Sequence, residues 1–342
     1  MTVRVLVVDD SALMRRIIVS ILQATEDLKV VGEAADPYEA RDLIKSLSPD
    51  VLTLDIEMPR MDGLSFLANL MRLRPMPVIM VSTLTAKGAD VTLQAMALGA
   101  VDFITKPTLA SAVASDWEQV GEELCHKIRM AAGSRWHGPA RSGQGQDLKF
   151  VGHAAHTLIA LGASTGGTEA LSVVLQRFPA DAPPVVLAQH IPPVFSTSYA
   201  NRLDRACKIR VHEAEDGMVI QPGHAYLAPG DFHLQVIGKP GAWQTKVSQS
   251  DKVNRHRPSV DVMFASLVPY ASYCRAALLT GMGNDGARGL SQLREAGAHT
   301  VIQDQATSVV WGMPGAAAAL GAAVCELPLS KIAQNLLERV SR

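Results

Sequence analysis

Long hydrophobic runs are missing from this sequence, and with them the usual marks of a membrane-bound or secreted chain. No uninterrupted apolar stretch reaches the roughly 20 residues of a membrane helix, since the alanine-rich run after Pro314 is short and broken by glycine. The apolar N-terminus meets Asp9 and Asp10 before it could form the core of a secretion signal. We therefore expect a cytoplasmic chain without a signal peptide or membrane insertion.

Cysteine is also scarce, and neither sign of charge is in excess. The four cysteines are scattered, with no CxxC pair and no zinc-like spacing to histidine, which is typical of reduced thiols. Lys plus Arg is 32 and Asp plus Glu is 33, so a net charge of −1 gives no electrostatic reason to expect nucleic-acid binding. What is present is an ordinary globular composition over 342 residues, enough for two domains with separate cores.

The first part of the chain alternates short β-branched runs with amphipathic helical patterns, which is typical of a parallel sheet with helices on both faces. The runs that predict strands are Val3–Val8, Lys29–Glu33, Val51–Leu54, Val78–Val81 and Asp102–Ile104. The helical patterns are Leu13–Gln23, Tyr38–Leu47, Leu64–Arg72 and Ala89–Leu98. We expect residues 1–130 to form a doubly wound (βα)₅ domain.

Residues 131–152 lose all apolar periodicity and are dominated by Gly, Ser, Pro, Gln and Arg, which favours a flexible linker over a long surface loop. A second alternating series follows in residues 153–342. Its predicted parallel strands are Thr157–Leu161, Val185–Ala188, Ala276–Leu279 and Thr300–Ile302. Its predicted helices are Glu169–Arg177, Ser196–Leu203, Val260–Leu267 and Gly289–Ala296. The glycine-rich segment Ile209–Gln249 indicates a mixed-strand insertion. The fold class is α/β, with two doubly wound domains.

Acidic residues stand where strands of the first domain are predicted to end. Asp9 and Asp10 follow the first strand, Asp55 the third, and Lys106 the fifth. Carboxyl ends of parallel strands meet in one crevice, where such carboxylates need a hard cation, and Mg²⁺ prefers oxygen ligands. Each residue alone could be a helix cap or a loop residue. Together with Ser82 they predict a Mg²⁺ site at which Asp55 accepts a phosphoryl group and Lys106 adds a fixed positive charge.

The segments VLVVDDSALMRR, LTLDIEMPRMDGL, PVIMVST and AVDFITKP resemble those of response regulator receiver domains. The resemblance implies Asp55 as the phospho-acceptor, Lys106 on the phosphoryl group and Ser82 as the switch hydroxyl. It implies Phe103 as the switch aromatic, although the pattern around Phe103 indicates by itself only a core residue. The carboxylates implied around Mg²⁺ are Asp9, Asp10 and Asp55.

In the second domain, a G-x-S-x-G pattern at Gly162–Gly166 lies between a predicted strand and a predicted helix. This context suits an exposed nucleophile, Ser164, although such a turn could also cradle a phosphate. His190 and Asp285 also follow strands; each alone could be a structural histidine or a turn residue. If these strands are neighbours, His190 can take the Ser164 proton while Asp285 fixes the histidine tautomer.

The segments LIALGASTGGTEAL, QHIPPVFS, NRHRPSVDVMF, LLTGMGNDGARGL and VVWGMPGAA resemble the chemotaxis protein-glutamate methylesterase (CheB) family. The resemblance implies Ser164, His190 and Asp285 as a catalytic triad, with the backbone near Thr165 and Met282 forming the oxyanion hole. It implies that hydrolysis needs no cofactor. The implied substrates are glutamate γ-methyl esters, and secondarily glutamines, on the cytoplasmic helices of chemoreceptors. The implied phosphodonor is a CheA-type histidine kinase.

The role of one basic stretch stays open, and two alternative functions of the second domain were considered. The stretch Arg255, His256 and Arg257 fits a solvated helix-capping segment and a surface for acidic receptor helices about equally. A nucleotide-binding module would use GASTGG as a phosphate cradle, but the sequence offers no P-loop lysine and no acidic residue to read a ribose. A DNA-binding output would need a basic recognition helix, which is not apparent.

Overall fold

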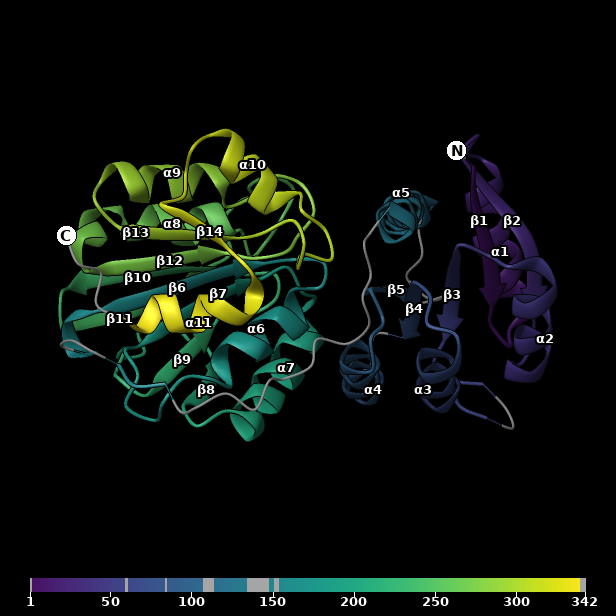
Figure 1. Cartoon of the computed structure of the whole chain (residues 1–342), viewed down its shortest axis with the longest axis horizontal. Coiled ribbons are helices and arrows are strands. Elements are labelled where there is room, and N and C mark those ends of the chain that lie inside the picture. Colours follow the sequence, from purple (N-terminus) through teal and green to yellow (C-terminus); the bar gives the residue numbers. More distant parts are fainter. Residues whose placement is uncertain are drawn as a thin grey trace. The chain divides into compact units, whose positions relative to one another are not determined.

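The computed structural model describes residues 2–58, 61–83, 85–106, 114–133, 148–150 and 154–338. The chain divides into two compact units, residues 1–139 and residues 140–342 (Figure 1). Among the described residues, no helix has both the length and the apolar character needed to cross a membrane.

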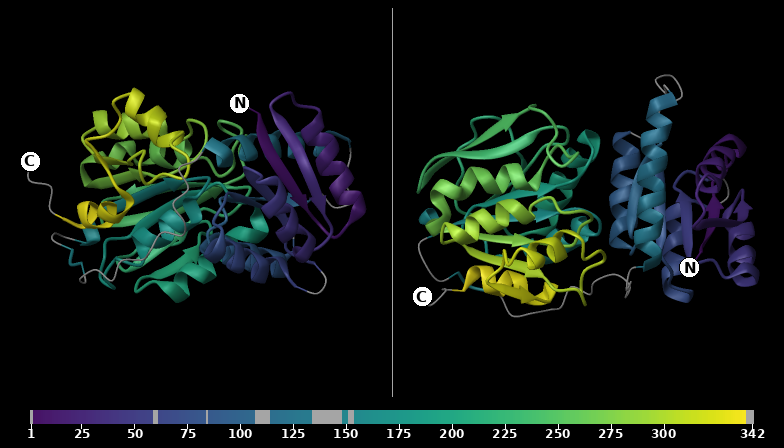
Figure 2. Two further views of the ribbon diagram at one scale, coloured as in Figure 1. Left: turned by 45° about the vertical axis from the view of Figure 1, so that its right-hand side comes forward. Right: turned by 90° about the horizontal axis from the view of Figure 1, so that it is seen from above.

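The first unit is a parallel sheet with strand order β2-β1-β3-β4-β5. The strands are β1 (Val3–Val8), β2 (Leu28–Ala34), β3 (Val51–Asp55), β4 (Val78–Thr83) and β5 (Asp102–Lys106). The helices α1 (Ala12–Gln23) and α5 (Ala114–Gly133) pack together on one face. The other face is covered by α2 (Pro37–Leu47), α3 (Gly63–Leu73) and α4 (Ala86–Ala97) (Figure 2). The predicted doubly wound arrangement is confirmed.

Polar residues start the helices of this unit where the strands end. The side-chain oxygens of Ser11, Asp36, Asp62 and Thr85 each accept a backbone N–H from the first turn of α1, α2, α3 and α4, respectively. Such caps contribute about 1 kcal/mol each, because helix-end N–H groups otherwise lack partners. They also fix where each loop leaves the sheet. The carboxyl ends of the strands therefore stay open for polar side chains.

The second unit is built on a parallel sheet with strand order β14-β13-β12-β6-β7-β9-β8. Its central strands are β6 (Leu158–Ala163), β7 (Val185–Gln189) and β12 (Cys274–Leu278). Its outer strands are β8 (Arg210–Glu213), β9 (His224–Leu227), β13 (His299–Gln303) and β14 (Cys325–Leu327). Both β6 and β7 are buried along their whole length, as expected for parallel strands covered on two faces.

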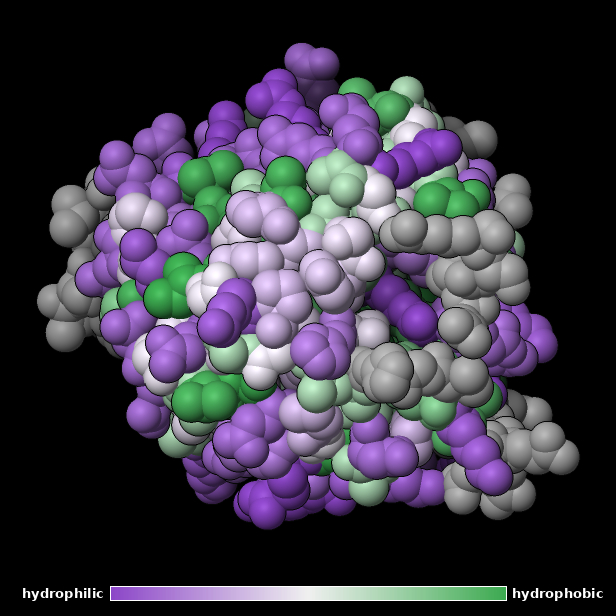
Figure 3. Space-filling model, turned by 90° about the vertical axis from the view of Figure 1, so that its left-hand side faces the viewer, coloured by the Kyte–Doolittle hydropathy of each residue, from purple (hydrophilic) through white to green (hydrophobic). Residues whose placement is uncertain are grey.

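Helices cover both faces of this second sheet. One face carries α6 (Gly167–Leu175), α7 (Pro193–Ala206) and α11 (Leu329–Leu337). The other carries α8 (Val260–Leu267), α9 (Ala287–Glu295) and α10 (Met313–Ala319), as Figure 1 shows. Two short 3₁₀ helices, η1 (Ala154–His156) and η2 (Val268–Tyr273), also belong to this unit. On the face of the chain drawn in Figure 3, hydrophilic side chains predominate and hydrophobic ones are dispersed.

The segment Ile209–Gln249 is only partly the mixed-strand insertion that the sequence suggests. Its first two strands, β8 and β9, extend the main sheet in parallel. Only β10 (His233–Lys239) and β11 (Ala242–Ser248) form a separate antiparallel hairpin, which packs on α8. Short strands carry too few residues for their periodicity to reveal which sheet they join.

The predicted linker, residues 131–152, falls mostly outside the described residues. Its first three residues belong to α5, which ends at Gly133. Where the chain is described again, the Phe150 ring lies 5.3 Å from the guanidinium of Arg275. The same guanidinium donates hydrogen bonds to the carbonyls of Leu336 and Glu338. Residues near both ends of the second unit therefore meet at one side chain of β12.

Candidate functional site

Three neighbouring strands of the second unit deliver a hydroxyl, an imidazole and a carboxylate to one end of the sheet. The strand β6 lies between β12 and β7, with direct backbone pairing to both. Ser164 follows β6, His190 follows β7, and Asp285 lies between β12 and α9. The backbone N–H of His190 also bonds the carbonyl of Ala163 at the end of β6. The strand adjacency that the sequence argument required is therefore present.

These three side chains form a continuous line of hydrogen bonds. His190 Nδ1 lies 3.1 Å from Ser164 Oγ, and His190 Nε2 lies 2.8 Å from Asp285 Oδ2. Because a carboxylate only accepts hydrogen bonds, the neutral imidazole carries its proton on Nε2. The lone pair on Nδ1 then faces the Ser164 hydroxyl. This arrangement can remove the serine proton and stabilise the imidazolium that results.

Asp285 is only 1% exposed, and several donors converge on it. Its Oδ1 accepts from Ser259 Oγ at 2.8 Å and Asn254 Nδ2 at 2.7 Å, and its Oδ2 accepts from Val260 N at 2.6 Å. Burial acts to raise the pKa of Asp285, but hydrogen bonds from His190, Asn254 and Ser259 outweigh it and hold that pKa well below its usual range. Asp285 is therefore a carboxylate at neutral pH.

The turn that carries Ser164 is held close to the loop after β12. Ser164 N donates to the carbonyl of Thr280 at 3.0 Å. A Cβ at Gly281 would lie 2.9 Å from Ser164 Cβ, so only glycine fits there. Met282 follows directly, and Thr165 follows Ser164 with its carbonyl accepting from Thr280 Oγ1. Both predicted oxyanion residues thus lie in the two segments that meet at Ser164.

His256 lies over the ring of His190, a contact that the sequence analysis missed. The two ring centroids are 3.7 Å apart and the rings are inclined by 11°. A tight turn with positive φ at Asn254 and Arg255 presents His256, and Arg257 is anchored on Asp231 by an ion pair of 2.8 Å. Neither reading of the Arg255–Arg257 stretch anticipated this stack. The only signal was the place of His256 in NRHRPS, which has no periodicity relating it to His190.

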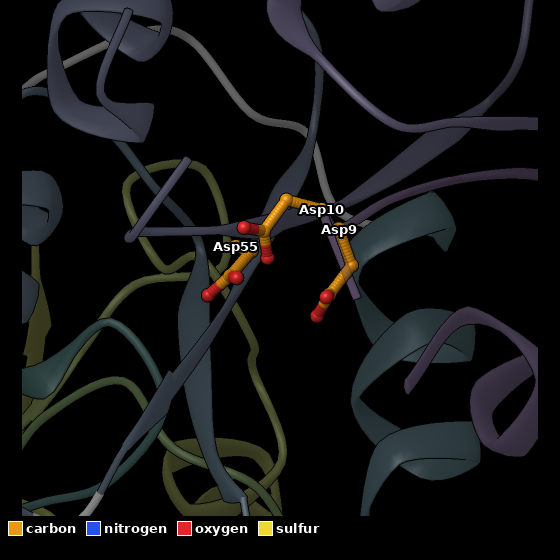
Figure 4. A group of neighbouring side chains, drawn as sticks. All are labelled: Asp9, Asp10 and Asp55. Carbon is orange, nitrogen blue, oxygen red and sulfur yellow. The ribbon is translucent and has the colours of Figure 1, made fainter. Parts of the chain in front are cut away.

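In the first unit, the three predicted carboxylates come together at the ends of β1 and β3. One ligand oxygen from each of Asp9, Asp10 and Asp55 lies within 4.8 Å of the others (Figure 4). Asp9 and Asp55 are buried and Asp10 is exposed. Lys106 Nζ lies 2.8 Å from Asp9 Oδ2 and 2.9 Å from Asp55 Oδ1. One ammonium therefore bridges two buried carboxylates.

The electrostatics of this cluster suit a divalent cation. Burial, helped by the negative charge of Asp9, raises the pKa of Asp55 to about 6, even though Lys106 opposes the shift. Although burial alone would lower it, the carboxylates of Asp55 and Asp9 raise the pKa of Lys106. The single positive charge of Lys106, shared between Asp9 and Asp55, offsets only part of the negative charge of the three carboxylates. The site has the oxygen ligands and the negative charge that Mg²⁺ requires.

The two predicted switch residues lie on β4 and β5. Ser82, on β4, is 1% exposed, and its Oγ is hydrogen-bonded to Thr92 Oγ1 of α4 at 2.8 Å. Phe103, on β5, is 7% exposed. Lys127 of α5 lies 5.5 Å from the centroid of the Phe103 ring and donates to the Phe103 carbonyl at 2.5 Å. Both residues are therefore packed against helices rather than free at the surface.

Comparison with known proteins assigns both units. The family model described as CheB methylesterase matches residues 159–336, and the response regulator receiver domain model matches residues 5–115. The protein-glutamate methylesterase/protein-glutamine glutaminase 2 of Xanthomonas oryzae pv. oryzae is 52% identical, over 98% of this chain and 96% of that relative. The protein of the corresponding name from Salmonella typhi is 49% identical, over 99% of this chain and 97% of that relative.

A solved structure resembles the second unit. The crystal structure of the Thermotoga maritima CheB methylesterase catalytic domain is 39% identical, with a TM-score of 0.51, and the match covers 53% of this chain and 97% of that one. The family model and the full-length relatives agree with it. The chain belongs to the CheB methylesterase family, and within it to the members that carry an N-terminal response regulator receiver domain.

Proposed function

We propose that this chain is a phosphorylation-controlled serine hydrolase that demethylates glutamate γ-methyl esters, and deamidates glutamines, on the cytoplasmic helices of chemoreceptors. The observation that carries the proposal is the line of hydrogen bonds from Ser164 through His190 to Asp285 in a member of this family. The relatives named above support the substrate class, since their names specify both activities.

Acylation begins when His190 Nδ1 takes the proton from Ser164 Oγ while Oγ attacks the ester carbonyl carbon. Asp285 stabilises the imidazolium through its bond to Nε2. His190 then passes the proton to the methoxy oxygen, the C–O bond breaks, and methanol leaves. With a glutamine substrate the proton goes to the amide nitrogen and ammonia leaves. In both cases Ser164 retains the glutamyl acyl group.

Deacylation repeats these proton transfers with water. His190 Nδ1 removes a proton from water as the oxygen attacks the acyl carbon, and then returns it to Ser164 Oγ as the carboxylic acid departs. The negative charge on the carbonyl oxygen needs backbone donors in both steps. We assign these to the backbone around Thr165 and Met282, because the two segments converge on Ser164 and α6 begins there with its positive end.

The first unit accepts the control signal at Asp55. Its carboxylate oxygen attacks the phosphorus of the donor phosphohistidine, the P–N bond breaks and the donor imidazole leaves, while Lys106 provides positive charge beside the transferred group. Mg²⁺, when bound by Asp9, Asp10 and Asp55, would neutralise the phosphoryl oxygens. The family and the receiver domain support a CheA-type histidine kinase as donor. Such a donor and the receptor helices imply action in the cytoplasm.

Labelling by a fluorophosphonate probe tests the hydrolase assignment. Wild-type protein should be labelled stoichiometrically on Ser164, while Ser164→Ala should not be labelled and should lose nearly all ester hydrolysis. His190→Ala should be labelled very slowly. A nucleotide-binding module with GASTGG as a phosphate cradle predicts no labelling of the wild type. Equal labelling of Ser164→Ala and wild type would contradict the assignment of the nucleophile.

Hydrolysis of methylated receptor tests the substrate class. Purified chain should release methanol from receptor cytoplasmic fragments that carry glutamate methyl esters, and a small-molecule phosphodonor with Mg²⁺ should raise the rate. A chain that hydrolyses small esters but leaves methylated receptor intact would retain the serine hydrolase assignment and refute the proposed substrate.

A further inference from the structure

Gln189, the last residue of β7, is a buried amide beside the turn that carries Ser164. It is 3% exposed, although glutamine side chains are usually exposed. Its Nε2 donates to the carbonyl of Ser164 at 2.9 Å and to the carbonyl of His190 at 3.2 Å. One side chain thus contacts the backbone of both the proposed nucleophile and the proposed base.

The orientation of this amide follows from its neighbours. With the amide reversed, Oε1 would face the carbonyl oxygens of Ser164 and His190, and like partial charges would oppose each other. The nitrogen must therefore point at the two carbonyls. Gln189 acts as a donor to both residues.

This arrangement has costs that an apolar side chain would avoid. Gln189 Oε1 is buried, and no residue in the described part of the chain donates to it. Room for it is made by Gly167 at the start of α6, where a Cβ would lie 2.2 Å from Oε1. Leucine or methionine would remove the orphaned Oε1, but it would also take away the donor to the carbonyls of Ser164 and His190. A buried polar group kept at such a cost needs an explanation in function.

We infer that Gln189 is a positioning residue for the nucleophile, an inference that rests on the proposed hydrolase function. The Ser164 backbone is held at both ends: its N–H donates to the carbonyl of Thr280, and its carbonyl accepts from Gly167 N at 2.7 Å and from Gln189 Nε2 at 2.9 Å. With both ends of the residue fixed, the Cα–Cβ bond is aimed so that Oγ meets His190 Nδ1 at 3.1 Å. Gln189 does not touch the reacting atoms. It acts through the geometry of Ser164.

The test uses full-length Gln189→Leu, with Gln189→Met read in its place if the leucine variant does not fold. Kinetics are measured with an aryl acetate ester and by the rate of fluorophosphonate labelling. Misplacement of about 1 Å can cost about 100-fold in rate, so we expect kcat and the labelling rate to fall by about 10- to 100-fold. KM should stay within about twofold, because the ester site itself is unchanged. Gln176→Leu makes the same chemical change at an exposed amide at the end of α6 and serves as the control for the substitution itself.

The outcomes separate this inference from the function on which it rests. If wild-type protein is not labelled at Ser164, the hydrolase function fails. If wild type is labelled and Gln189→Leu is labelled at the same rate, the hydrolase stands and the positioning role is refuted. A fall in rate that is matched by Gln176→Leu, or a change in KM alone, would likewise overturn the positioning role.

A double-mutant cycle with Gly167 gives an independent reading. Gly167→Ala should lower the labelling rate, because its Cβ would lie 2.2 Å from Gln189 Oε1 and 2.6 Å from Ala163 Cβ. In a Gln189→Ala background the same Gly167→Ala change should lower the rate less, since the clash with the amide is gone and only the contact with Ala163 remains. Equal effects in the two backgrounds would show that Gly167 and Gln189 are not coupled, contrary to the inference.

Discussion

Asp285 receives more hydrogen bonds than the orientation of one imidazole requires. Ser259 and Asn254 bind Oδ1, whereas Val260 N and His190 bind Oδ2. Both oxygens must therefore be acceptors at once. An ionised carboxylate meets this demand, and a neutral amide does not, because one of its two atoms is a donor. The surroundings of Asp285 thus select its charge as well as its position.

Asp285→Asn should fold with reduced stability, because the amide nitrogen opposes one of the surrounding donors, and it should reduce ester hydrolysis by about 10⁴-fold. The amide would turn an N–H towards His190 Nε2 and so favour the tautomer with its proton on Nδ1, which cannot accept from Ser164. Steady-state hydrolysis with a circular-dichroism control checks this. Wild-type activity in the folded variant would remove Asp285 from the proposed triad.

The carboxyl of Asp55 should make Mg²⁺ binding depend on pH near 6. Because its pKa is raised to about 6 in the folded chain, from an ordinary value of 3.8, folding is favoured below the lower value and loses that contribution as pH rises through the higher one. Mg²⁺ binds the ionised form, so the apparent Kd should rise towards tenfold per pH unit below pH 6. Calorimetric titration from pH 5 to 7.5 measures this.

Asp55→Asn provides the control for this titration. Its Mg²⁺ affinity should be weaker than that of wild type and nearly flat over the same pH range, since the titrating carboxyl is gone. An affinity of wild type that does not change between pH 5 and 7 would exclude Asp55 as the group that binds the ion.

At the scale of elements, the long buried strands were predictable and the short or weakly patterned elements were not. Val3–Val8 and Val185–Gln189 carry near-continuous apolar runs, which identify them. By contrast, β14 has three residues, and α10 is an alanine-rich segment without an amphipathic pattern. Helix α11 does carry an amphipathic pattern, with Ile332, Ala333 and Leu336 buried on one face, and the sequence analysis did not use it. The local sequence pattern does not predict an element whose structure depends mainly on tertiary packing.

The contact between β4 and α4 yields a prediction for the switch. Ser82 must leave Thr92 if its hydroxyl is to reach a phosphoryl group on Asp55. Thr92→Val keeps the shape but leaves the buried Ser82 hydroxyl without this partner, which destabilises the unphosphorylated form by about 1 kcal/mol. The phosphoryl mimic beryllofluoride should then bind about fivefold more tightly. Fluorescence or calorimetric titration with Mg²⁺ present gives the affinity.

Ser82→Ala should change the affinity for beryllofluoride in the opposite direction. It removes the hydroxyl itself, so beryllofluoride should bind more weakly than to wild type. Thr92→Val that binds the mimic with unchanged or lower affinity would show that the Ser82–Thr92 bond does not restrain the switch.

For the whole molecule, the sequence predicted the residues of the proposed triad but not the residues that contact them. Ser164, His190 and Asp285 each follow a recognisable strand, so topology alone brings them together. The sequence analysis missed Gln189 and His256 because their roles depend on contacts between loops. Gln189 is a buried amide at the end of a strand, and His256 is a ring in a tight turn. Such contacts have no period in sequence. They are fixed only when the strands are in register.

Two units in one chain also predict control of one by the other. We expect that the unphosphorylated receiver lowers access to Ser164 and that phosphorylation relieves this. Removal of residues 1–133, which ends the deletion at the last residue of α5, should then raise hydrolysis of methylated receptor. The comparison is made with full-length protein with and without phosphodonor. A folded fragment that is no faster than the unphosphorylated full-length chain would argue against inhibition by the receiver.

Arg275 contacts Phe150, Leu336 and Glu338, so the two ends of the second unit lie close together. This proximity allows the unit to be joined to other domains. A unit whose entry and exit lie together can be attached to a neighbour by either end, or spliced into a host loop, without stretching its own sheet. A different regulatory domain could therefore be joined in front of this unit without a change in its sheet. The same property makes the unit a candidate for circular permutation, in which the serine, histidine and aspartate would follow one another in a new order along the chain.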